Sequence, residues 1–145
     1  MKRTLTLGLI LLILFTSGSK MIFAQGAEAA VKSTLGKLFD YSKSKAYEKA
    51  SALIAYNGED RTRNQKDAFN STNKDELNQV KRVCKKISAL IDLCSKHEFG
   101  NFETKKDGAN ENYIIEVNFV SGYQKLVTAF SFIKTDKGYL LININ

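Results

Sequence analysis

The residues best suited to chemistry lie near the C-terminus, where polar and apolar residues alternate. Because side chains alternate between the two faces of a strand, Tyr113, Thr128 and Phe130 are expected on the inward face. A pocket tyrosine can work with a carboxyl group whose pKa is tuned by an apolar lining. Glu116 is the carboxylate within the three strands expected nearest the C-terminus, but the alternation places it on the face opposite to Tyr113. We therefore predict no catalytic residue, and take Tyr113, Thr128 and Phe130 as candidates for ligand binding.

A metal site would need the histidine and the cysteines, and their spacing does not assemble one. His97 is the single histidine, and we expect it at the C-terminal end of a helix, where the macrodipole favours a positive charge. Cys94 lies three residues before it and could add a second ligand, but a zinc site uses three or four protein ligands. Cys84 is too distant to contribute. The sequence therefore predicts no metal and no other cofactor.

An even number of cysteines permits a disulfide, but helical geometry argues against one here. Cys84 and Cys94 belong to an apolar stripe with helical spacing, and ten residues of helix separate their Cα atoms by about 15 Å. A disulfide tolerates no more than about 7 Å. Buried free thiols are therefore the prediction. A bridge across a broken helix, and intermolecular or metal chemistry, are the alternatives.

The same helix carries a basic cluster made of Lys81, Arg82, Lys85 and Lys86. It is either a solvated helix face or a surface attracted to anionic lipid or another acidic partner, to which each charge contributes about 1 kcal/mol. The net charge of +7 falls to +4 once the three basic residues of the first 24 are excluded. Since there is no arginine-rich tract or nucleic-acid motif, we predict no nucleic-acid partner.

The N-terminus has the layout of a secretory signal peptide, with two basic residues, an apolar run over residues 5–15 and small residues at a cleavage site. That run is shorter than the roughly 20 apolar residues of a membrane span. We predict a signal peptide at residues 1–24, cleaved before Gln25, or alternatively after Gly18. Residues 25–145 then form one periplasmic or secreted domain without a stable membrane span. No cysteine lies near the cut, so no lipid anchor is expected.

Helical periodicity follows the cleavage site. Residues 27–58 predict two helices separated by the polar stretch 42–45, with Asn57 and Gly58 ending the second, because these residue types commonly adopt the left-handed conformation after a helix. In the second helix, the segment KAYEKASALI is expected to supply packing residues rather than site residues.

A long polar loop over residues 57–75 comes next, and Phe69 is its single large apolar residue. A third helix is predicted from Asn73 to about His97. Asn73 is expected to cap its first turn, and Glu76 to reach back in a capping box.

Beyond this helix the hydrophobic period changes to two, which predicts four antiparallel strands joined by short turns. Their expected bounds are 98–106, 112–120, 123–134 and 138–145. The third strand is apolar on both faces and should be central. In the second strand, one face is expected to be inward and consists of Tyr113, Ile115, Val117 and Phe119. The fold class predicted is α+β, with N-terminal helices packed on a curved four-stranded antiparallel sheet.

This order of elements, together with the segment KAYEKASALI, resembles the nuclear-transport-factor-2-like (cystatin-like) superfamily, in particular its small exported bacterial domains of unknown function. The resemblance implies a cone-like curved sheet whose open end holds a small ligand, an active site or nothing. It also implies a possible homodimer.

The function expected is an exported, non-enzymatic domain that binds a small apolar ligand or a protein partner through the cone mouth or an exposed strand. A small isomerase or dehydratase with a pocket in the cone is the first alternative. A protein that binds anionic surfaces through the basic cluster is the second. An enclosed cavity that presents Tyr113 beside a carboxylate would favour the enzyme, whereas an interior filled by side chains would exclude the enzyme.

Overall fold

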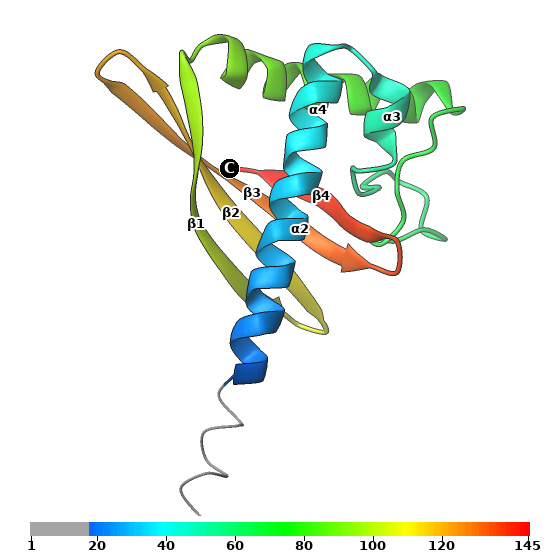
Figure 1. Ribbon diagram of the computed structural model, residues 1–145. Helices are drawn as coiled ribbons and strands as arrows, with labels where there is room; N and C mark the ends of the chain where they lie inside the picture. The colour runs from blue at the N-terminus through cyan, green and yellow to red at the C-terminus, as the bar shows by residue number, and fades with distance from the viewer. Residues whose placement is uncertain (1–17) are drawn as a thin grey trace, which may run out of the picture.

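Residues 18–145 have an α+β fold in which three helices pack on one four-stranded antiparallel sheet (Figure 1). The computed structural model describes residues 18–145. The strands follow one another in the order β1-β2-β3-β4, so the predicted fold class is confirmed. Most of the predicted signal peptide, residues 1–17, lies outside the described residues. The elements are α2 (Gly18–Lys43), α3 (Tyr47–Ser51), α4 (Lys74–Asp92), β1 (Lys96–Asp107), β2 (Asn110–Ser121), β3 (Gln124–Thr135) and β4 (Gly138–Ile144).

The long helix α2 lies across one face of the sheet, and α4 crosses near the C-terminal end of α2 (Figure 1). The expected apolar stripe of α2 is buried, and consists of Val31, Leu35, Leu38 and Phe39. The helix ends as predicted in the polar stretch, where Lys45 adopts a positive φ of 58°. Within residues 18–145, no helix combines the length and apolar character needed to cross a membrane.

The second predicted helix is shorter than its sequence pattern indicates. It ends at Ser51, and the prediction that Asn57 and Gly58 end it is wrong. The chain after Ser51 becomes extended because the outer edge of β4 offers backbone partners. Ala55 N–H donates to the carbonyl of Leu141 (2.8 Å), and Leu141 N–H donates to the carbonyl of Leu53 (2.9 Å).

Helix α4 begins as predicted, with the side chain of Asn73 accepting hydrogen bonds from the backbone N–H groups of residues 75 and 76. Two other predictions for this helix are wrong. It ends at Asp92 rather than near His97, which lies in β1. Glu76 does not close a capping box, because its carboxylate accepts hydrogen bonds from Arg63 (2.7 Å) and from Asn70 N–H (2.7 Å) instead.

The sheet matches the predicted strands to within about two residues at each end. All four residues expected to point inward in β2 are buried, and β3 is a central strand. A bulge interrupts β1, where Gly100 and Asn101 both lie opposite Glu116 of β2. A Cβ at Gly100 would lie 3.1 Å from the Asn118 side chain, so a glycine suits this close approach.

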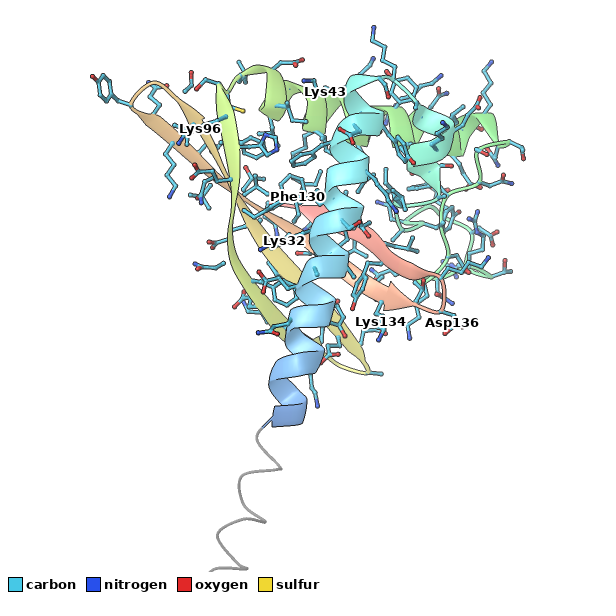
Figure 2. The ribbon with its side chains drawn as sticks, viewed as in Figure 1. Lys32, Lys43, Lys96, Phe130, Lys134 and Asp136 are labelled. Carbon is cyan, nitrogen blue, oxygen red and sulfur yellow. The ribbon has the colours of Figure 1, made fainter. Side chains whose placement is uncertain are left out.

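The space between the helices and the sheet is filled by side chains. One cluster of buried residues joins α2 and α4 to β2, β3 and β4, and Figure 2 places Phe130 between α2 and the sheet. The largest side chains of this cluster with less than 2% exposure are Phe130, Phe132, Leu35, Leu38, Ile87, Ile115 and Leu141. The described interior is therefore a packed core.

Candidate functional site

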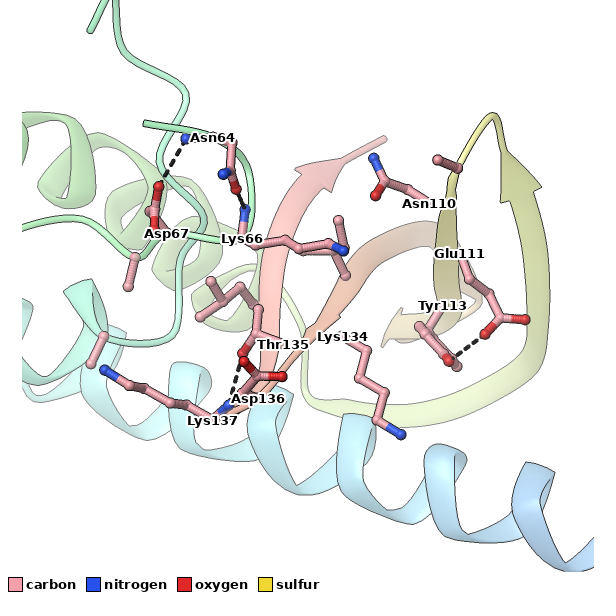
Figure 3. Close-up of a pocket in the computed structure, with 15 residues that line it drawn as sticks. Asn64, Lys66, Asp67, Asn110, Glu111, Tyr113, Lys134, Thr135, Asp136 and Lys137 are labelled. Atoms are coloured by element: carbon pink, nitrogen blue, oxygen red, sulfur yellow. Dashed lines mark hydrogen bonds between the residues drawn. The ribbon is translucent and has the colours of Figure 1, made fainter. Parts of the chain in front are cut away.

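A polar hollow of about 700 Å³ lies at the end of the sheet that carries the turn between β3 and β4 (Figure 3). The loop after α3, the start of β2 and the β3–β4 turn form its walls. Its lining combines lysines, acids and amides, so it suits a polar ligand better than an apolar one. The main polar residues are Asn64, Lys66, Asn110, Lys134, Asp136 and Lys137.

Tyr113 lines this hollow and donates a hydrogen bond of 2.6 Å to the carboxylate of Glu111 (Figure 3). The prediction that no carboxylate lies beside this tyrosine is therefore wrong. It fails because β2 begins at Asn110, two residues before its expected start. One further step of the same alternation would have placed Glu111 on the face of Tyr113.

The environment of Tyr113 keeps its hydroxyl protonated. Burial raises the pKa of Tyr113 above its ordinary value, and the hydrogen bond and negative charge of Glu111 raise it further. Burial also raises the pKa of Tyr139, whose ring lies 5.0 Å from the Tyr113 ring. The neutral phenol already donates its one proton to the carboxylate, so the hydroxyl has no further proton to offer to a substrate. The geometry therefore suits a fixed wall of the hollow more than an acid–base couple.

The raised pKa of Tyr113 gives a pH-dependent stability. The native state holds this proton more tightly than the unfolded chain, in which tyrosine ionises near pH 10. Its contribution is thus fully present below about pH 10 and is lost as the pH rises above that value. Urea unfolding at pH 9 and at pH 11 should show a smaller drop for Tyr113→Phe than for the wild-type protein. An equal drop would contradict this assignment.

The other two ligand-binding candidates lie elsewhere. Phe130 is fully buried, with its ring 5.8 Å from Phe39 and 6.5 Å from Phe119. Thr128 is also buried. Neither residue belongs to the wall of the polar hollow, so the structure brings Tyr113, Thr128 and Phe130 to one face of the sheet but not to one pocket.

The opposite end of the sheet exposes large apolar side chains on the hairpin of β2 and β3. Tyr123 is fully exposed in the turn, Leu126 is 52% exposed and Val127 is 48% exposed. We call residues 121–128 the hairpin tip. It is uncovered because β4 is shorter than β3 and pairs with it only from Phe130 onward. The sequence predicted β3 as a central strand that is longer than β4, but the unpaired stretch that follows from this difference was not among the predictions.

The basic cluster on α4 is partly engaged in contacts with the protein itself. The Lys86 ammonium donates to the carbonyl of Ile144 (2.8 Å), and the Lys81 ammonium lies 5.9 Å from the ring centre of Tyr47. Arg82 and Lys85 are exposed. Lys86 is exposed as well, and neither a carbonyl nor an aromatic ring neutralises an ammonium group, so all four residues of the cluster keep their positive charge.

The cysteines are free, as predicted. Cys84 is fully buried and Cys94 is half-buried just after α4. His97 packs its ring edge-on against Phe39 at 5.1 Å. Among residues 18–145, no three histidine, cysteine, aspartate or glutamate side chains are grouped as metal ligands would be.

The two thiols should differ in reactivity. Burial raises the pKa of the Cys84 thiol, and the thiolate is the reactive form. In a titration with a disulfide reagent, we expect one fast thiol in the native protein and a second only after denaturation in urea. Cys94→Ser should remove the fast phase, and Cys84→Ser should leave it. Two fast thiols in the native protein would contradict this prediction.

Comparison with known proteins adds no relative: no protein-family model, no curated protein and no solved structure matches the chain. The class of protein is therefore defined by the structure alone, as an α+β domain with helices on one face of an antiparallel sheet.

Proposed function

We propose that this protein is a non-enzymatic, exported binding domain that docks a partner protein through the hairpin tip. One observation carries the proposal: Tyr123, Leu126 and Val127 are all exposed at one end of the sheet, with Leu126 on its helix-facing side and Val127 on the other side. Single exposed apolar residues are common on protein surfaces, but grouped ones mark interaction sites. Aromatic side chains such as tyrosine also supply much of the binding energy at interfaces.

A protein partner fits the molecule better than a small apolar ligand does. The described interior is filled by side chains such as Phe130 and Phe132, and the polar hollow combines apolar side chains with lysines and carboxylates, which a purely apolar ligand would leave without partners. The proposal includes export, which the N-terminal sequence pattern supports. It also includes membership of the nuclear-transport-factor-2-like family, which the order of the elements supports.

Site-specific crosslinking in the native host tests this function. A photoreactive amino acid at position 127 should give one adduct with a second protein species. The same amino acid at position 137, near the polar hollow and at the opposite end of the sheet, serves as the matched control and should not give that adduct. Lack of an adduct at 127, or the same adduct from both positions, would overturn the proposal.

A second candidate, a small isomerase or dehydratase, is favoured by the contact between Tyr113 and Glu111 at the hollow. Such an enzyme would exchange a proton next to a carbonyl group. Proton NMR in D₂O, with cyclohexenone as the probe, measures that exchange. The enzyme predicts catalysed exchange that Glu111→Gln abolishes, while the binding domain predicts the same exchange rate with and without protein.

A further inference from the structure

We propose that a positively charged face around α3 and α4 binds the surface of a membrane that contains anionic lipids. We call it the basic face. It combines the basic cluster of α4 with three lysines at the end of α2, in the following turn and in α3, and its members are Lys43, Lys45, Lys49, Lys81, Arg82, Lys85 and Lys86. It does not include the hairpin tip, so this binding goes beyond the proposed function.

The charge of the protein is concentrated on this face. Residues 43–49 and 77–91 contain seven basic residues and one acidic residue, which gives a net charge of +6. The rest of residues 25–145 contains 12 basic and 14 acidic residues, a net charge of −2. The charge of +4 is therefore not spread evenly over the molecule. An anionic surface attracts such a domain and turns its basic face toward the surface before contact.

The fold brings the two basic segments together. Helix α3 packs against α4, and the Lys81 ammonium of α4 lies 5.9 Å from the ring centre of Tyr47 in α3. Figure 2 shows Lys43 at the end of α2 that lies beside α4, and Lys134 at the opposite end of the molecule. The exposed acids of α4 are Asp75 and Asp92. They lie in its first and last turns, which leaves the middle of the helix positive.

The charges of the basic face have no carboxylate partner among residues 18–145. None of the seven residues forms an ion pair there, whereas Lys32, Lys96 and Lys105 each pair with a glutamate. Six of the seven side chains are exposed, and Lys81 is half-buried. An anionic surface would therefore meet accessible positive charges that no acid of the described residues neutralises.

The composition of the face suits lipid headgroups better than a protein or a nucleic acid. Six of its seven residues are lysines, and lysine is depleted at protein interfaces. The exposed large apolar side chains of the described residues all lie outside the face, so it lacks the anchors on which protein interfaces depend. Forked recognition of single phosphates favours arginine. A charged membrane needs neither, because each lysine near its surface strengthens binding by about fivefold.

Vesicle sedimentation with the full chain tests this binding. One set of vesicles consists of phosphatidylcholine alone, and the other also contains phosphatidylglycerol, which is anionic. We expect more protein to sediment with the anionic vesicles. Raising the salt from about 0.1 M to about 1 M shortens the Debye length from about 10 Å to about 3 Å and should abolish the difference. The apolar run of residues 5–15 carries no charge and would bind both sets alike, so the difference measures the basic face.

A matched pair of double variants locates the binding on the molecule. Lys49→Gln with Lys85→Gln removes two exposed charges from the basic face, and should lower the excess partition into anionic vesicles by about 25-fold. Lys134→Gln with Lys137→Gln removes two exposed charges from the polar hollow. This control has the same net charge, but its substitutions lie at the opposite end of the molecule, and we expect a change of about twofold or less.

Three results would overturn the proposal. The first is equal sedimentation with both sets of vesicles at low salt, and the second is an equal loss in the two double variants. The third is binding to soluble polyglutamate, but not to anionic vesicles, that Lys49→Gln with Lys85→Gln weakens. It would assign the face to an acidic protein. Each of these results leaves the crosslinking experiment at position 127 unaffected, so the proposed function stands or fails separately.

Discussion

Phe130→Ala is expected to lower the free energy of unfolding by about 3–5 kcal/mol. Phe130 has no exposed surface, and its ring packs against Phe39 of α2 and Phe119 of β2. Truncation would remove these contacts and leave a cavity that the rigid sheet cannot close. A single domain has only about 5–15 kcal/mol of stability, so the variant should be marginally folded. Urea denaturation followed by circular dichroism measures the loss.

Phe99→Ala is the matched control, because it removes the same ring from β1, where it is 38% exposed. We expect a loss of about 1 kcal/mol or less. If both variants lose equally little, Phe130 is not a core residue, and its prediction as a ligand-binding residue regains support. If Phe130→Ala loses several times more free energy of unfolding than Phe99→Ala, Phe130 is a core residue.

Much of the architecture is predictable from the sequence, because burial imposes a period on each element. In β2 the alternation of Ile115 and Val117 with polar residues fixed both the strand and its buried face. In α2 the spacing of Leu35 and Leu38 predicted both the helix and its buried face. Such patterns are local, and so a single segment suffices to recognise them.

The errors arise where a distant segment decides the local structure. Residues 52–56 follow a helical pattern. Ala55 instead forms a backbone hydrogen bond with the edge of β4, which lies about 85 residues later in the chain. Glu76 occupies the capping-box position, but Arg63 in the polar loop attracts its carboxylate. Propensity is a weak guide when tertiary contacts compete with it.

The candidate interface could have been predicted from the sequence. β3 has 12 residues and β4 has 7, and both lengths were nearly correct in the prediction. Because a short turn joins the two strands, this difference in length leaves residues 124–128 of β3 without a partner in β4. Leu126 and Val127 belong to that stretch and are about half exposed.

Glu76→Ala is expected to lower the free energy of unfolding by about 2–3 kcal/mol, because it leaves charged and polar partners unpaired. The Glu76 carboxylate binds Arg63 and the backbone N–H of Asn70, each at 2.7 Å. The Arg63 guanidinium also donates to the carbonyl of Ala68 (2.6 Å) and lies 3.8 Å from the ring centre of Tyr56. These contacts fix the polar loop, which has few apolar anchors of its own.

Urea denaturation measures this loss, and Glu103→Ala provides the matched control. Glu103 pairs with Lys105 at 2.8 Å, but both side chains are more than half exposed, so its removal should cost about 0.5 kcal/mol or less. Arg63→Ala and the double variant complete a mutant cycle, whose coupling energy should be about 1–3 kcal/mol if the two side chains act together. The Glu76→Ala protein should also be cleaved faster by protease between residues 57 and 73. Equal losses for Glu76→Ala and Glu103→Ala, with unchanged cleavage, would mean that the loop is held by Phe69 alone.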